Sequence, residues 1–202
     1  MGRRSDHTRA ELEELILSAG HTLVAEAGLG GFSAREVARR IGYSIGTIHN
    51  VFRSSDRLIA ALNTRSFVAW AAFLRERLEA VGEDGDRLAA LVAGYFGFAR
   101  QHTHWWTAIY DHRLPADTSL SEADEAGRGL LTGIVVEEVA RALRRPVDET
   151  VVTLSRSLIA TVHGHCAFEI SGAWALMGGS DAEATALARV RETLSVVAQD
   201  IH

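Results

Sequence analysis

This 202-residue chain contains only two prolines, Pro115 and Pro146, and their scarcity strongly limits its secondary structure. A proline inside a helix removes a backbone donor and breaks the helix, so long stretches without proline leave room for long helices. Apolar residues recur at spacings of three and four along most of the chain, whereas the alternation typical of strands is hard to find. The sequence therefore predicts an all-α protein of about nine helices.

The composition indicates a folded globular protein. The apolar fraction is 47% and the charged fraction is 23%, which argues against intrinsic disorder. The single cysteine, Cys166, excludes an intramolecular disulfide and indicates a reducing compartment. No apolar run approaches the roughly 18 residues of a membrane helix, and no signal-peptide pattern follows the N-terminal arginines. We therefore expect a cytoplasmic protein that does not associate with a membrane.

The basic residues, all of them arginines, are distributed unevenly. Residues 1–60 hold 8 arginines against 7 acidic residues, whereas residues 61–202 hold 13 against 19, which together give the net charge of -5. An anionic partner such as nucleic acid is therefore expected only at the N-terminal end of the chain.

The first 54 residues predict three short helices. Apolar residues on one face mark the first helix: Leu12, Leu15, Ile16, Ala19, Leu23 and Ala27. Gly28 ends this helix, and Ser33 with Glu36 has the spacing of a capping box for the second. Gly42 then ends the second helix, and Ser44 caps a third that continues to Phe52.

The second and third helices have the spacing of a helix-turn-helix. Such short helices need packing partners, and Ala38, Gly42 and Ile48 supply a close crossing, a turn and an apolar contact between helices. The outward residues of the third helix are compact and nearly uncharged: Tyr43, Ser44, Ile45, Thr47, His49 and Asn50. Hydroxyl, amide and imidazole groups suit phosphate oxygens and base edges in a major groove. The pattern predicts DNA binding, the alternative being a helix-turn-helix used only for packing.

The segment from Leu23 to Leu62 resembles the DNA-binding domain of TetR-type transcriptional regulators. The phrases GFSAREVARRIG, SIGTIHNVF and SSDRLIAAL fit that family in order and without gaps. The resemblance implies a DNA-binding domain over residues 1–54 and a helical ligand-binding and dimerisation domain over residues 55–202, joined through a fourth helix. It also implies a homodimer that binds double-stranded DNA at a palindromic operator.

Two residues depart from the commoner family pattern, and both concern phosphate binding. His49 stands where a tyrosine is usual, and Ser55 stands where a lysine often contacts the DNA backbone. We therefore expect the phosphate contacts to be redistributed over residues of the arm and the helix starts: Arg3, Arg4, Arg9, Ser33, Arg35, Arg53 and Ser55.

The remaining chain predicts further helices over about 55–81, around 88–96, and over about 121–145 and 148–177, with a last helix capped within Ser180–Glu183. Two phrases, Trp106–Pro115 and His163-Gly164 with Phe168-Glu169, resemble a C-terminal domain type of the TetR superfamily named for Trp, His and Gly. Aromatic walls with a few polar groups are typical of small-molecule pockets. The predicted ligand-binding residues are Trp105, Trp106, Tyr110, His112, His163, Cys166 and Phe168. The alternative is that these side chains form ordinary core.

The histidines and the cysteine of this region could also form a metal site or a catalytic site. His102 with His104, and His163 with His165, are spaced by two, which places the imidazoles on different sides of a helix, so a metal-responsive sensor is only an alternative. Cys166 lies near His163, but no oxyanion-stabilising loop accompanies them, and a cysteine in an apolar helix usually packs as a small hydrophobe. We expect no enzyme activity, no bound metal and no cofactor.

The C-terminal helix carries a narrow apolar seam like that of a coiled coil: Leu187, Val190, Leu194, Val197 and Ile201. Together with the helix over 148–177, this seam predicts a four-helix dimer interface, the alternative being packing within one monomer. The expected function is that of a ligand-responsive repressor released from its operator by a small molecule, and an activator of the same fold stays open.

Overall fold

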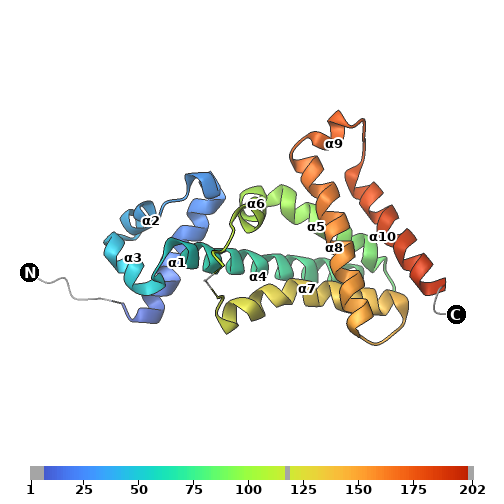
Figure 1. The fold of residues 1–202 in the computed structure, drawn as a ribbon, viewed down its shortest axis with the longest axis horizontal. Helices are drawn as coiled ribbons and strands as arrows, with labels where there is room; N and C mark the ends of the chain where they lie inside the picture. Colours follow the sequence, from blue (N-terminus) through green and yellow to red (C-terminus); the bar gives the residue numbers. More distant parts are fainter. Residues whose placement is uncertain (1–6, 117–118, 200–202) are drawn as a thin grey trace, which may run out of the picture. The chain divides into compact units, whose positions relative to one another are not determined.

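The computed structural model describes residues 7–116 and 119–199 and confirms the all-α fold (Figure 1). Within these residues there are ten α-helices, one 3-10 helix, η1 (Leu29–Gly31), and no strand. The helices are α1 (Arg9–Ala27), α2 (Ala34–Ile41), α3 (Ile45–Phe52), α4 (Ser55–Val81), α5 (Arg87–Gln101), α6 (Thr103–Asp111), α7 (Glu122–Leu143), α8 (Glu149–Ile170), α9 (Ala173–Leu176) and α10 (Ala182–Gln199). Three residues selected from the sequence, Arg3, Arg4 and Ile201, lie outside the described ranges.

The helices group into two compact units. Unit 1 comprises Met1–Ser66 and His102–Gly127, and unit 2 comprises Phe67–Gln101 and Arg128–His202. The boundary expected near residue 54 therefore differs from this grouping, because unit 1 also contains the start of α4 and the whole of α6. Helix α4 is continuous and contributes to both units.

Unit 1 is built on α1, against which α2, α3 and α6 pack. Its core contains Leu12, Ile16 and Leu23 of the apolar face predicted for α1, whereas Leu15 and Ala19 are partly buried and Ala27 is exposed. The inner residues of the helix-turn-helix and of the neighbouring helices complete the core: Val24, Val37, Ala38, Ile48, Phe52, Leu58, Leu62 and Ala108. Helices of eight residues gain most of their stability from such packing, as predicted.

The helix ends of unit 1 follow the sequence signals with one exception. Gly28 and Gly42 end α1 and α2 with φ angles of 65° and 73°, which favour glycine. The capping box predicted at Ser33 and Glu36 is wrong, since the Ser33 side chain makes no capping hydrogen bond. The Glu36 carboxylate instead accepts three hydrogen bonds from Arg39 and Arg40 of its own helix, and these bonds between opposite charges replace the single bond that it would make to the Ser33 amide.

Unit 2 has α8 and α10 side by side with α5 packed against both (Figure 1). Its centre contains Trp70, which stacks on Phe98 with 4.9 Å between ring centroids. The single helix predicted over 148–177 is divided, because Gly172 takes a φ angle of 78° between α8 and α9. Within the described ranges, no helix combines the length and the apolarity needed to cross a membrane.

Candidate nucleic-acid interface and ligand cavity

Helix α3 separates an apolar inner face from a polar outer face. Ile48 and Phe52 are buried in the core of unit 1. The predicted DNA-reading residues lie on the other side, where Ser44, Ile45, His49 and Asn50 are exposed and Tyr43 and Thr47 are partly buried. The structure thus brings all six residues together on one accessible surface of α3 and the turn before it.

Hydrogen bonds fix the start of this surface. The Ser44 hydroxyl accepts the Thr47 N–H at 3.2 Å, which confirms the predicted cap, and its oxygen lies 3.0 Å from the Thr47 hydroxyl. The Tyr43 hydroxyl lies 2.7 Å from Nδ1 of His7, and Arg9 donates to the Val51 carbonyl at 3.4 Å. The residues that precede α1 and the turn before α3 are therefore joined by side-chain contacts.

The arginines near α3 fall into two groups. Arg39 and Arg40 are paired with Glu36, whose pKa these hydrogen bonds lower to about 2, and Arg40 also bonds to Glu26 at 2.7 Å. Arg35 and Arg53 are exposed and form no ion pair within the described residues. These two guanidinium groups therefore have no competing carboxylate and are available for phosphate.

The remaining predicted DNA contacts lie at the starts of α2 and α4. Ser33 and Ser55 are both exposed at the starts of these helices. The hydroxyl that caps α4 belongs to Ser54, which accepts the Arg57 N–H at 3.2 Å. Arg57, which was not predicted as a DNA contact, is exposed in the first turn of α4, and its basic charge beside Ser54–Asp56 is a signal for such a role.

The predicted ligand-binding aromatics of α6 lie in packing contacts of unit 1. The Trp105 indole N–H donates to the His21 carbonyl at 3.0 Å, and Nε2 of His112 lies 3.1 Å from the Asp56 carboxylate. Trp106 is buried, and Tyr110 is 42% exposed with its ring 5.3 Å from that of Trp106. Helix α6 is thus held to α1 and α4 inside the unit that contains the helix-turn-helix.

The three ligand-binding residues predicted on α8 belong to unit 2, whereas those of α6 belong to unit 1. His163 bonds through Nδ1 to the Tyr95 hydroxyl at 3.0 Å. Cys166 is fully buried, and burial raises its thiol pKa to about 12, so no thiolate forms near neutral pH. Phe168 is 47% exposed.

His21 occupies an unusual position for a histidine, in the interior of unit 1. Its ring stacks on Trp105 with 4.0 Å between centroids, and its Nε2 lies 3.0 Å from the Ser66 hydroxyl. Since that hydroxyl donates to the Leu62 carbonyl, the His21 N–H is the donor to Ser66. Burial, with smaller contributions from Arg65 and His102, lowers the pKa of His21 from 6.5 to about 4.

We expect the buried His21 to make the protein less stable in mild acid. Between pH 6.5 and about 4 the unfolded chain binds a proton at His21 that the folded chain does not. Stability from this group is therefore complete above pH 6.5, and about 3 kcal/mol of it is lost as the pH falls towards 4. Urea unfolding at a series of pH values measures the effect, which His21→Gln should remove and His49→Gln should retain. Equal pH dependence in both variants would contradict this assignment.

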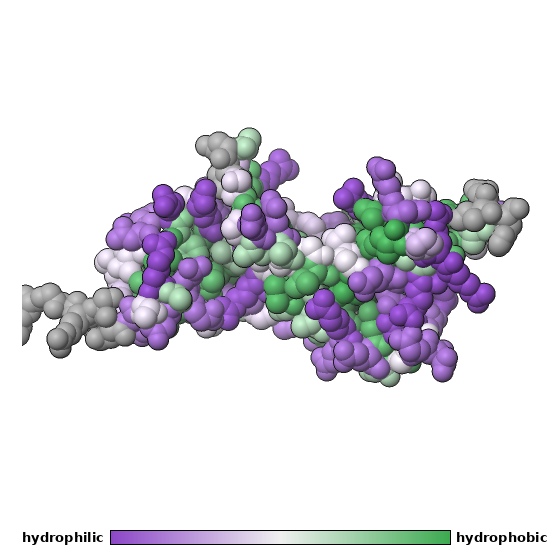
Figure 2. All heavy atoms as spheres, turned by 90° about the horizontal axis from the view of Figure 1, so that it is seen from below, coloured by the Kyte–Doolittle hydropathy of each residue, from purple (hydrophilic) through white to green (hydrophobic). Residues whose placement is uncertain are grey.

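The C-terminal seam predicted as a dimer interface is used in part inside the protomer. Val190 and Leu194 are 4% and 6% exposed, whereas Leu187 and Val197 are partly buried. Figure 2 shows hydrophobic patches between the polar side chains of one face of the molecule. The exposed large apolar residues of unit 2 are Val68, Val81, Leu130, Val147, Phe168, Leu176, Met177 and Val196.

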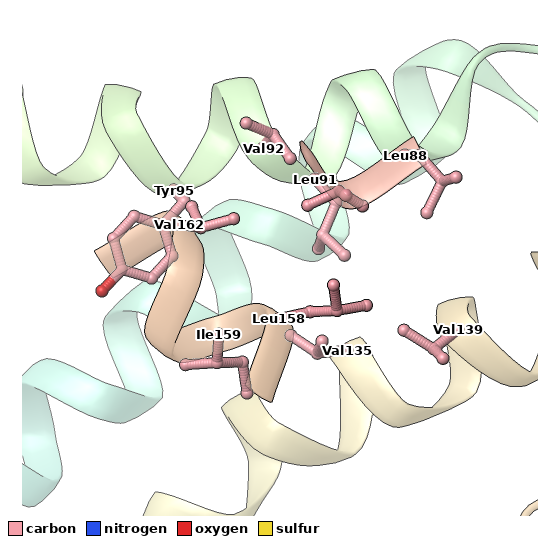
Figure 3. A pocket seen from close by; sticks show the side chains of 10 residues that line it. Leu88, Leu91, Val92, Tyr95, Val135, Val139, Leu158, Ile159 and Val162 are labelled. Atoms are coloured by element: carbon pink, nitrogen blue, oxygen red, sulfur yellow. The ribbon is translucent and has the colours of Figure 1, made fainter. Parts of the chain in front are cut away.

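Unit 2 contains an apolar cavity of about 40 Å³ that is partly open to solvent. Four helices line it: α5 with Leu88, Leu91, Val92 and Tyr95, α7 with Val135 and Val139, α8 with Leu158, Ile159 and Val162, and α10 with Val190. Figure 3 shows these side chains converging from α5, α7 and α8, with the Tyr95 hydroxyl at one end of the group. None of the predicted ligand-binding residues is among them.

The described part of the chain holds no group of three or more His, Cys, Asp or Glu side chains arranged to bind a metal ion.

Comparison with known proteins gives two family matches. The family model described as "Bacterial regulatory proteins, tetR family" matches residues 16–62, which include α2, α3 and the start of α4. The model described as "Tetracyclin repressor-like, C-terminal domain" matches residues 88–192, which is more than half of the chain.

Individual relatives agree with these matches. An HTH-type transcriptional regulator of Mycobacterium tuberculosis is 23% identical over 201 residues, covering 85% of this chain and 86% of the relative. A Rhodococcus sp. RHA1 protein of unknown function has a TM-score of 0.68 at 21% identity and covers 96% of this chain and 97% of its own. The multidrug binding protein EbrR, solved with imidazole, has a TM-score of 0.62 at 19% identity. The match covers 93% of this chain and 95% of the EbrR chain.

Proposed function

Because the chain belongs to the tetR family of bacterial regulatory proteins, we propose that it is a repressor that leaves a palindromic operator when a small molecule binds. Members of this family are DNA-binding transcription regulators, and the family is not one of enzymes. The observation that supports the proposal best is the outer face of α3, which is exposed, polar and almost uncharged while Ile48 and Phe52 hold the inner face in the core.

The proposed complex has two protomers on one operator. Each protomer places α3 in a major groove, and the two copies read half-sites about 34–36 Å apart. Ser44, Thr47, His49 and Asn50 face the base edges, and the unpaired guanidinium groups of Arg35 and Arg53 bind flanking phosphates. Polar side chains specify the sequence, whereas the arginines supply most of the salt-dependent affinity.

Arg35→Ala tests the placement of the phosphate contacts. We expect operator binding to weaken at least about 100-fold, because one charge-assisted hydrogen bond of about 1.5–3 kcal/mol is lost from each of the two half-sites. The slope of log affinity against log salt should fall by about 0.9 for each lost contact, hence by about two in a dimer. A mobility-shift titration on the DNA flanking the protein's own gene, at several salt concentrations, measures both quantities. Arg75→Ala, an exposed arginine of α4, is the matched control.

An unchanged affinity and slope for Arg35→Ala would show that phosphate is bound elsewhere. If the wild-type protein binds no palindrome near its own or neighbouring genes, the repressor proposal itself fails. A promoter fusion then decides the sign of regulation, since deletion of a repressor raises expression whereas deletion of an activator lowers it.

The proposed dimer uses the outward faces of α8 and α10. The outward face of α8 carries small residues that allow a close helix approach, followed by one exposed ring: Thr153, Ser157, Ala160, Gly164 and Phe168. Val196 is 52% exposed on the neighbouring α10. Pairing of both helices with their symmetry mates would cover these residues and give a four-helix interface.

Release by a ligand needs a connection between unit 2 and the helix-turn-helix. Helix α4 runs without a break from Ser55 to Val81 and contributes to both units. A ligand empties the operator only if it binds the unbound geometry more tightly, by several kcal/mol. The likeness in fold to EbrR, a multidrug binding protein, supports a small molecule as the signal.

A further inference from the structure

We propose that the effector of this regulator is an uncharged, predominantly apolar small molecule with at most one polar group, bound in the cavity of unit 2. The proposal rests on the proposed function, because it specifies the chemistry of the signal. It replaces the aromatic and histidine residues selected from the sequence by an aliphatic site that four helices build.

The lining of the cavity is almost entirely aliphatic. Nine of its ten residues are leucine, isoleucine or valine, and the phenol of Tyr95 is the one side chain with a polar atom. Transfer of a charged group into such surroundings is strongly unfavourable, since no partner replaces its hydration. Apolar ligand surface, in contrast, gains free energy in proportion to the area removed from water.

The charged groups next to the cavity are already paired with each other. Arg87 and Glu138 adjoin the lining residues Leu88 and Val139 in the chain. Their side chains form two hydrogen bonds, of 2.8 Å and 2.6 Å, and Arg87 also donates to the carbonyls of Leu78 and Gly82. Neither side chain lines the cavity, so no charged group there is available to a ligand, which is a second reason to expect a neutral effector.

One end of the cavity has a polar pair of side chains, and this pair is uncharged. The Tyr95 hydroxyl lies at one end of the lining group and 3.0 Å from Nδ1 of His163 (Figure 3). Burial lowers the pKa of His163 below its usual value, so the pair is neutral near pH 7 and does not attract an anion. One hydroxyl or carbonyl group of a ligand can join this pair. The cavity volume of about 40 Å³ is well below the range of drug-sized sites, so we expect the effector to insert a small or slender apolar part while the rest lies in the opening.

A matched pair of fluorescent probes tests the charge preference. N-phenyl-1-naphthylamine is uncharged, and 8-anilino-1-naphthalenesulfonate has the same ring skeleton with one sulfonate. We expect the uncharged probe to bind the full-length protein at least tenfold more tightly and to be displaced by n-alkanols. Each added methylene should tighten the alkanol about fourfold until the cavity is filled. A sulfonate probe that binds equally well, or alkanols without a chain-length dependence, would overturn the proposal.

Valine-to-phenylalanine variants locate the site. Val135→Phe fills part of the cavity and should weaken the uncharged probe at least tenfold, whereas Val147→Phe adds the same ring at an exposed loop and should leave binding unchanged. Equal binding by both variants would place the probe elsewhere. The alkanol series on the wild-type protein remains decisive if Val135→Phe does not fold.

The operator assay separates this proposal from the proposed function. Binding of the neutral probe without any operator binding would leave the apolar site standing and remove the repressor function. Operator release by polar or charged compounds, with alkanols inactive, would retain the repressor and overturn the inferred effector chemistry.

Discussion

Glu138→Ala should lower the free energy of unfolding by about 3–5 kcal/mol, the largest loss of stability that we expect from one side chain here. Glu138 is 6% exposed and binds Arg87 through both carboxylate oxygens, at 2.6 Å and 2.8 Å. The pair joins the start of α5 to α7, and Arg87 extends the connection to the carbonyls that end α4. Removal of the carboxylate leaves the partly buried Arg87 guanidinium, 15% exposed, without its counter-ion, which is why the loss is large.

Urea unfolding at a fixed protein concentration measures this loss, since stability of a dimer depends on concentration. The control is Glu192→Ala, which removes an exposed ion pair with Arg189 and should change stability by at most about 1 kcal/mol. The double variant Arg87→Met with Glu138→Leu should regain most of the stability, because a well-packed apolar pair has no charge to desolvate. A loss for Glu138→Ala no larger than the control would show that the pair is solvated in solution.

Gly164→Leu should leave the protomer folded and weaken the dimer at least about 30-fold. A Cβ at Gly164 meets no heavy atom within 4 Å in the protomer, and replacing a glycine inside a helix favours the helix. If α8 packs closely against its symmetry mate, however, a twofold interface receives the added side chain twice. Each overpacked site is unfavourable by about 1–3 kcal/mol.

Sedimentation over a dilution series measures this dissociation. Gly129→Leu is the matched control, because it lies on α7 and its added Cβ also meets open space. Operator affinity should fall together with dimerisation, since one protomer binds a single half-site. If Gly164→Leu dimerises like the wild-type protein, α8 is not part of the interface and the proposed four-helix arrangement is wrong.

Local sequence signals predicted the elements of unit 1 well. Apolar spacing identified α1, and Gly28 and Gly42 mark its end and that of α2 because both need a φ angle that other residues avoid. Ser44 caps α3 as expected. These predictions succeed because each depends on residues within one or two helical turns.

Competition between local signals explains the failures. Ser33 and Glu36 have the spacing of a capping box, but Arg39 and Arg40 lie one turn further and bind the same carboxylate. The helix expected up to Met177 ends at Ile170, although Gly172 offered a visible signal for a break.

The all-helical fold, the helix-turn-helix and the polar face of α3 could be predicted from the sequence alone, because helical periodicity and turn residues act over short distances. The packing of Trp105 and His112 that holds α6 within unit 1, and the aliphatic cavity between α5, α7, α8 and α10, depend on contacts between distant parts of the chain. Aromatic and histidine side chains look alike in a sequence whether they pack in a core or line a site. What distinguishes the two is the packing of helices far apart in the chain, which no local spacing records.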